Sequence, residues 1–156
     1  MKRKLVHSFV LVAIAIAGAS ISAAQSRGES EVFQLVNKER VRARLGGLAW
    51  DHRLAGLARD YSRQMAREGF FDHDDPEGRT VIDRAQSARL KNWSIIGENL
   101  FFCEPHSHFA STAIRGWMKS RTHRTNILDR EWTATGVGIA NASDGSIFIT
   151  QVFTRE

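Results

Sequence analysis

The stretch Gly97-Glu98-Asn99-Leu100-Phe101-Phe102 places one carboxylate, Glu98, in the most apolar part of the chain. Burying an unpaired charge is costly, so Glu98 requires a partner. Two histidines are candidates: His73, which follows Phe-Phe-Asp in a turn-rich segment, and His123, which lies among arginines. The sequence therefore predicts that segments far apart along the chain converge on Glu98.

Helical patterns dominate the first half of the chain. Apolar residues at helical spacing predict a helix over residues 31–45 and a second over residues 51–69, which Asp51 caps. A capping box at Thr80 predicts a short helix, and Ser107 is expected to cap another. The apolar stripe of this last helix is expected to bury Ala113, Ile114 and Trp117 and to leave Lys119 and Arg121 exposed.

Strand-like sequence follows in the second half. Residues 92–102 predict a strand broken around Gly97. Residues 136–140 and 146–153 flank a turn-rich segment and predict a hairpin. Because helices cluster early and strands late, the fold class is α+β rather than a parallel doubly wound sheet.

Residues 1–24 have the three parts of a secretory signal peptide. Lys2-Arg3-Lys4 precedes an apolar run, and Ser22 and Ala24 fit the small-residue rule for cleavage. We therefore expect cleavage after Ala24 and a secreted or periplasmic protein with no stable membrane span. The alternative is an uncleaved anchor, because residues 5–24 are nearly long enough to span a bilayer.

Residues 25–156 have the length of one domain with a sizeable core. Three of the 22 Lys and Arg residues and none of the 17 acidic residues lie in the signal segment, which leaves 19 basic and 17 acidic residues and a net charge of +2. This balance gives no electrostatic footprint for nucleic acid. The basic cluster of Lys38, Arg40, Arg42 and Arg44 is expected to be a solvated helix face.

Cys103 is the only cysteine in the sequence, so no internal disulfide can form. Its apolar neighbours favour a small buried hydrophobic residue, while an intermolecular bridge or a reactive thiol are the alternatives. Cys103, His106 and His108 could also form a local metal set, although three ligands on adjoining loop residues would strain a tetrahedral shell.

Five short motifs follow one another along the chain: residues 70–73, 97–101, 117–127, 136–138 and 150–153. In this order they resemble the bacterial branch of the CAP superfamily, the SCP-like proteins that include the cysteine-rich secretory, antigen 5 and pathogenesis-related proteins. The resemblance covers the chain from about Glu31 to Phe153. It implies a three-layer α-β-α sandwich with a mainly antiparallel central sheet.

The resemblance also implies a ligand cleft. His73 and Glu98 match the family's cleft residues, and Ser120 and His123 belong to the bacterial pattern Trp-x-x-Ser-x-x-His-x-x-Asn-Ile, intact at residues 117–127. From the residues alone, His73 could be an exposed turn histidine, Glu98 a structural carboxylate and His123 a surface side chain.

The chain departs from the eukaryotic pattern at two places, because Ser120 replaces a second glutamate and Phe148 replaces a histidine. Near polar loops, Trp93 and Trp132 are candidates for the rim of the cleft.

His73, His123 and Glu98 are also a plausible zinc set, since imidazole nitrogen and carboxylate oxygen are zinc ligands. Their spacing carries no metal signature of its own. Relatives bind zinc through cleft histidines, so His73 and His123 are the expected ligands of zinc or another divalent metal.

Three functions compete. The first is a binding or interaction module for a metal ion, lipid or partner, with an unknown ligand or a cell-wall component as its partner. The second is a peptidoglycan-cleaving enzyme in which Glu98 is the general acid and His73 and His123 position substrate or water. The third is a metal-dependent protease, although no His-Glu-x-x-His helix is present. The absence of an activated nucleophile favours the binding module.

Overall fold

The computed structural model describes residues 25–155, so the predicted signal peptide and its cleavage after Ala24 lie outside the described residues. Within that range the chain forms five helices and four strands. The helices are α1 (Arg27–Arg42), α2 (His52–Glu68), α3 (Val81–Ser87), α4 (Phe109–Lys119) and α5 (Arg121–Leu128). The strands are β1 (Ala49–Trp50), β2 (Ile95–Cys103), β3 (Ala134–Asn141) and β4 (Ile147–Arg155).

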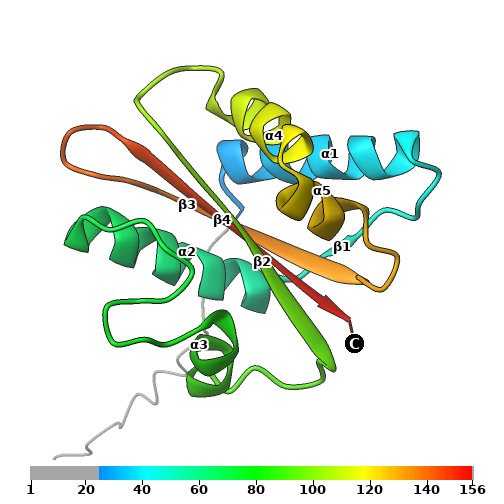
Figure 1. Ribbon diagram of the computed structural model, residues 1–156, viewed down its shortest axis with the longest axis horizontal. Helices are drawn as coiled ribbons and strands as arrows, with labels where there is room; N and C mark the ends of the chain where they lie inside the picture. Colours follow the sequence, from blue (N-terminus) through cyan, green and yellow to red (C-terminus); the bar gives the residue numbers. More distant parts are fainter. Residues whose placement is uncertain (1–24, 156) are drawn as a thin grey trace, which may run out of the picture.

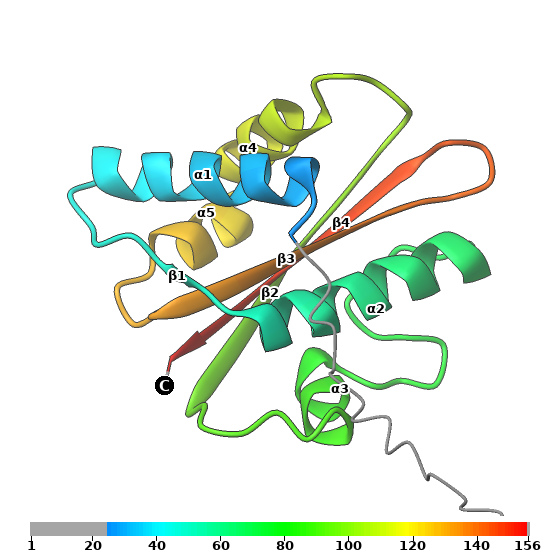
Figure 2. The same cartoon turned by 180° about the vertical axis from the view of Figure 1, so that it is seen from behind.

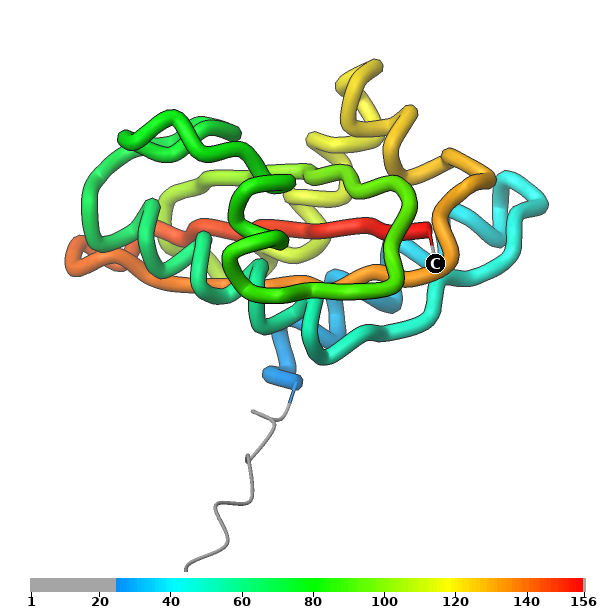
Figure 3. The backbone as a smooth tube through the Cα atoms, turned by 90° about the horizontal axis from the view of Figure 1, so that it is seen from below, coloured from blue at the N-terminus to red at the C-terminus, as the bar shows by residue number. Residues whose placement is uncertain are grey.

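The four strands form one sheet in the order β1-β3-β4-β2. The three long strands pair antiparallel and lie side by side in Figure 3, and β1 pairs parallel with β3. Helices α2 and α3 lie on one face of the sheet, and α1, α4 and α5 lie on the other (Figures 1 and 2). The predicted α+β class and three-layer α-β-α sandwich are therefore confirmed.

Helix α2 lies directly on β3 because two glycines of that strand carry no side chain towards it. A Cβ atom on Gly136 would lie 2.1 Å from the backbone nitrogen of Ala55, and one on Gly138 would lie 2.1 Å from that of Arg59. The Ser62 hydroxyl of α2 donates a hydrogen bond of 3.0 Å to the carbonyl of Gly138. The Gly-Val-Gly motif thus sets the distance between the helix and the sheet.

The opposite face of the sheet holds the larger core. Val32 and Val36 of α1 and Trp117 of α4 pack with Ile149 and Phe153 of β4, and all five are buried. As expected, Ala113, Ile114 and Trp117 of α4 are buried, while Lys119 at the end of α4 and Arg121 at the start of α5 are exposed. Within residues 25–155 none of the helices combines the length and the apolar character needed to cross a bilayer.

Local signals placed several helix ends well. Asp51 caps α2 through hydrogen bonds from Arg53 and Leu54, and Gly69 ends that helix in the left-handed conformation. Thr80 and Asp83 form the predicted capping box of α3.

The predicted starts of two helices were wrong. Helix α1 begins at Arg27 rather than Glu31, because Ser26 and Glu29 form a second capping box, and it ends at Arg42. Helix α4 has His108 at its N-cap position without a side-chain hydrogen bond, so Ser107 is not its cap.

The predicted break at Gly97 is also wrong, because β2 runs through it without interruption. A Cβ atom at Gly97 would lie 2.9 Å from the indole of Trp132, so the glycine makes room for this ring.

Trp132 is buried and stacks on Phe153 with 5.7 Å between ring centroids. Trp132 is therefore a core residue and not part of a cleft rim. Trp93 is partly buried and packs against the smaller core beneath α2.

Arg40 contradicts the expected solvated face of α1. Its side chain is buried and donates hydrogen bonds to the carbonyls of Gly46 at 2.8 Å, Ile127 at 2.9 Å and Asp129 at 2.7 Å. Arg40 thus ties α1 to the end of α5, because guanidinium has enough donors to satisfy several carbonyls at once.

The close contact between α2 and β3 leads to a first prediction. Replacing Gly138 by Ala forces a methyl group into the backbone of α2 and should lower the free energy of unfolding by about 3 kcal/mol. Urea denaturation measures the change.

Gly56→Ala in α2 is the matched control. Nothing lies within 4 Å of a Cβ atom built at Gly56, so this variant should gain about 0.5 to 1 kcal/mol of helix stability. Equal unfolding midpoints for the two variants would contradict the packing described for β3.

Candidate functional site

Glu98 lies on β2 with its side chain on the face covered by α2 and α3. The residue is 7% exposed, and both carboxylate oxygens are engaged. Oε1 is 2.9 Å from Nδ1 of His73, and Oε2 accepts a hydrogen bond of 2.8 Å from the guanidinium of Arg84. Glu98 therefore has the expected contact with His73 and a second partner, Arg84, that the sequence analysis missed.

Arg84 of α3 is the hub of this side of the site. Its guanidinium carbon lies 3.3 Å from the ring centroid of Tyr61 in α2, a cation–π contact. The same guanidinium donates hydrogen bonds to the backbone carbonyls of His73 at 3.0 Å and Arg79 at 2.8 Å. Arg84 thus holds the carboxylate of Glu98 and the loop that carries His73.

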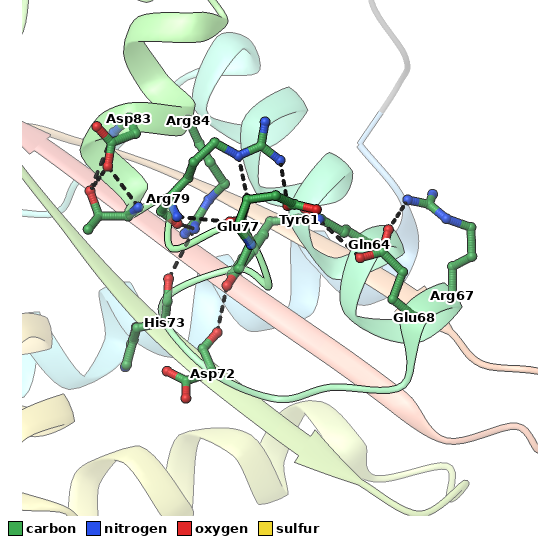
Figure 4. A network of polar contacts seen from close by, with 12 residues as sticks. Tyr61, Gln64, Arg67, Glu68, Asp72, His73, Glu77, Arg79, Asp83 and Arg84 are labelled. Carbon is green, nitrogen blue, oxygen red and sulfur yellow. Dashed lines mark hydrogen bonds and ion pairs between the residues drawn. The ribbon is translucent and has the colours of Figure 1, made fainter.

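The loop between α2 and α3 presents His73. The Tyr61 hydroxyl donates a hydrogen bond of 2.7 Å to the carbonyl of Asp72, and Figure 4 shows this bond together with the one from Arg84 to His73. Asp75 is buried, and its carboxylate accepts hydrogen bonds from the backbone of Glu77 and Arg79. These bonds fix the loop, while the imidazole of His73 remains 55% exposed.

His123 lies on α5, next to β2, which is an edge strand of the sheet. Its Nδ1 is 2.8 Å from the hydroxyl of Ser120, and its carbonyl accepts a hydrogen bond of 3.2 Å from the side chain of Asn99. Because successive side chains of a strand point to opposite faces, Asn99 reaches towards α5 while Glu98 reaches towards α3. Within residues 25–155 the imidazole of His123 makes no hydrogen bond with the carboxylate of Glu98, so the two residues are connected through the β2 strand.

Helices α4 and α5 also cover the outer edge of β2. Asn126 donates a hydrogen bond of 3.1 Å to the carbonyl of Glu98 and one of 2.9 Å to the side chain of Asn99. The indole of Trp117 donates a hydrogen bond of 2.8 Å to the carbonyl of Leu100. Unpaired edge carbonyls invite pairing with other chains, so Trp117 and Asn126 of the 117–127 pattern protect the strand that carries Glu98.

The two histidines differ in their electrostatic surroundings. The hydrogen bond with Glu98 raises the pKa of His73, against the opposing effect of burial. Burial lowers the pKa of His123, and the positive charge of His73 lowers that pKa further. His73 is therefore the imidazole that more readily carries a charge.

No group of three or more His, Cys, Asp or Glu side chains in residues 25–155 is arranged to hold a metal ion. Cys103, His106 and His108, which the sequence analysis considered as a strained alternative, therefore do not form such a group, and neither does a three-ligand set that includes Glu98. Cys103 is partly buried, and burial raises the pKa of its thiol, which disfavours the reactive-thiol alternative. A site with His73 and His123 as its two protein ligands stays a prediction.

The family model of the cysteine-rich secretory protein family, CAP, matches residues 33–153. The chain belongs to the CAP family. This confirms the resemblance drawn from the five motifs.

The CAP domain has bacterial relatives. It is 32% identical over 123 residues to the uncharacterized protein YkwD of Bacillus subtilis, an alignment that covers 79% of this chain and 46% of YkwD. The crystal structure of an extracellular protein containing an SCP domain from Bacillus anthracis is 34% identical, with a TM-score of 0.69 and coverage of 83% of this chain and 40% of that one. The chain therefore spans less than half the length of both relatives.

A more distant solved structure shows the same fold. NaASP2, whose crystal structure was determined with Zn2+, is 15% identical, with a TM-score of 0.59 and coverage of 83% of this chain and 80% of NaASP2. At this identity the likeness establishes the fold alone.

Arg84 is the main residue that sequence reasoning overlooked. Histidines are weak cations at neutral pH, so a buried carboxylate calls for a guanidinium or an ammonium group. The sequence did hold a signal for this role, because Arg84 lies on the predicted short helix that directly precedes the strand of Glu98.

The buried ion pair between Arg84 and Glu98 leads to a second prediction. Arg84→Met keeps most of the side-chain length but leaves Glu98 without its guanidinium partner, and the free energy of unfolding should fall by about 3 kcal/mol. The control is Arg63→Met, because Arg63 forms an exposed pair with Asp60 on α2. This control should change stability by no more than about 0.5 kcal/mol. Similar effects in both variants would refute the structural role of Arg84.

A third prediction concerns pH. A raised pKa in the folded state means that His73 stabilises the fold fully below its unfolded value, about 6.5, and that this contribution is lost as pH rises through the folded value. His73→Asn should therefore cost more stability at about pH 5.5 than at about pH 8.5.

NMR titration of the wild-type imidazoles supplies an independent measurement. The midpoint of His73 should lie above that of His123, because their pKa values are shifted in opposite directions. The reverse order would contradict the surroundings described for both rings.

Proposed function

We propose that this CAP domain is a binding module in which His73 and His123 hold a divalent cation, with zinc the best candidate. The observation that carries the proposal is that each imidazole has its Nδ1 engaged by a protein group, Glu98 for His73 and Ser120 for His123. Histidines that bind metals usually have their second ring nitrogen held in this way, because the bond fixes the tautomer and the ring orientation.

The Nε2 atoms are the ligand atoms in this proposal. An imidazole that donates its Nδ1 proton to a carboxylate exposes an unprotonated Nε2, which is the form that coordinates zinc. Two imidazoles leave open coordination positions, so the ion would be held weakly and could bind a further ligand or water. NaASP2, the relative solved with Zn2+, supports zinc as the first ion to test.

The arrangement around Glu98 does not favour the enzyme alternatives. A general acid must deliver a proton to its substrate, whereas both oxygens of Glu98 are bonded within the protein, to His73 and Arg84. Glu98 acts here as a positioning residue for His73, and the cation site supplies binding rather than turnover.

We also propose that the module works outside the cytoplasm. The signal-like sequence of residues 1–24 and the extracellular Bacillus anthracis relative support this location. An unidentified ligand or a cell-wall component is then the partner to expect.

Calorimetric titration with zinc tests the proposal in a fourth prediction. Wild-type protein should bind zinc weakly, and His73→Ala and His123→Ala should each lower the affinity by about tenfold or more. The matched control is His106→Ala, because His106 is an exposed histidine outside the site. Equal affinities in all four proteins would remove the metal site.

The zinc affinity measured in this titration should also depend on pH. Protons compete with zinc for the imidazoles, so affinity should fall as pH drops from about 8 to about 6. Release of soluble fragments from purified peptidoglycan by the wild type, but not by Glu98→Gln, would instead support the glycan-cleaving alternative.

A further inference from the structure

Helix α5 has a second polar face, which points away from the candidate site. This face borders a cavity of about 660 Å³ at the junction of α4 and α5. Four cationic side chains line the cavity, from the end of α4, from α5 and from the segment that follows it: Lys119, Arg121, Arg124 and Arg130. We call this set, together with Arg44, the basic groove.

Arg44 joins the set through a neighbouring cavity of about 480 Å³. Arg130 lines both cavities, and Arg44 lines the second one beside the Gly46-Gly47 turn. The shared arginine makes the two cavities adjacent, so the cations form a track rather than a single point.

The cationic side chains of the basic groove do not take part in the polar contacts that hold the fold together. Within residues 25–155 none of these five side chains makes a hydrogen bond or an ion pair, and all five residues are exposed. Elsewhere on the surface, arginines such as Arg53, Arg63 and Arg155 are paired with carboxylates. The groove therefore concentrates unneutralised charge in a domain whose overall charge is nearly balanced.

Among residues 25–155, Asp129 is the one acidic residue that lines the first cavity. Its carboxylate accepts a hydrogen bond of 2.9 Å from the backbone of Glu131. Its backbone carbonyl accepts a hydrogen bond of 2.7 Å from the buried Arg40, whose pKa the charge of Asp129 helps to raise against the effect of burial. Asp129 offsets one of the four positive charges, which leaves a net charge of +3 among the residues that line the first cavity.

We propose that the basic groove binds a linear polyanion that carries phosphate groups along a non-aromatic chain. Four of the five cations are arginines, whose planar guanidinium groups match phosphate oxygens in pairs. A track of separated cations fits repeated charges along a chain better than one isolated anion.

A single-stranded nucleic acid fits less well. Such ligands need aromatic platforms for their bases. Among residues 25–155, Trp132 is the one aromatic residue that lines either cavity, and it is buried in the core. This site is separate from the zinc site, because His123 and Asn126 lie on the face of α5 that contacts β2.

Binding of a long-chain inorganic polyphosphate tests the proposal in a fifth prediction. The full chain should bind polyphosphate, and the logarithm of the affinity should fall linearly with the logarithm of the salt concentration. The double variant Arg124→Gln and Arg130→Gln should bind about tenfold or more weakly, and the salt slope should fall by about one for each cation removed. Fluorescence anisotropy with labelled polyphosphate measures both quantities.

Lys91→Gln is the matched control, because Lys91 is exposed and lines a different cavity beside α3. It should leave affinity and salt slope unchanged, and thermal unfolding should show that all variants are folded. No binding of polyphosphate, or an equal loss in the control, would overturn the proposal. Tighter binding of a single-stranded oligonucleotide than of polyphosphate would overturn it in favour of nucleic acid.

Discussion

The buried carboxylate of Glu98 is the constraint on which the arrangement of this domain depends. A charge in the middle of an apolar strand is tolerated only when its oxygens are bonded, and here Arg84 and His73 supply the bonds. Those two residues come from α3 and from the loop before it, so the carboxylate fixes both against β2. Tyr61 extends the constraint to α2 through its contact with Arg84. One charged group thus links α2, α3 and the loop between them to β2.

The opposite side of β2 follows from a second requirement, the protection of an edge strand. The carbonyls of Glu98 and Leu100 point outwards, and Asn126 and Trp117 bond to them. Helix α5 consequently lies close to β2 and brings His123 near the strand. The same helix turns Arg121 and Arg124 towards solvent, which separates the candidate cation site from the basic groove.

Many local features could be predicted from the sequence because they depend on neighbours in the chain. The cap at Asp51, the capping box at Thr80 and the β3–β4 hairpin involve residues a few positions apart, so their patterns are visible without the fold. The five family motifs extended this knowledge to the three-layer architecture. The need of Glu98 for a partner was also evident, since any buried carboxylate has it.

The sequence by itself determined the fold class, the caps of α2 and α3, and His73 as one of two candidate partners of Glu98. The continuity of β2 through Gly97 and the burial of Arg40 depend on contacts that close only when distant segments pack. Arg84 became the main partner of Glu98 for the same reason, because its position follows from how α3 docks beside Tyr61. Pairing across a sheet and packing of a helix are set by total burial and charge compensation over the whole domain, and no local pattern encodes them.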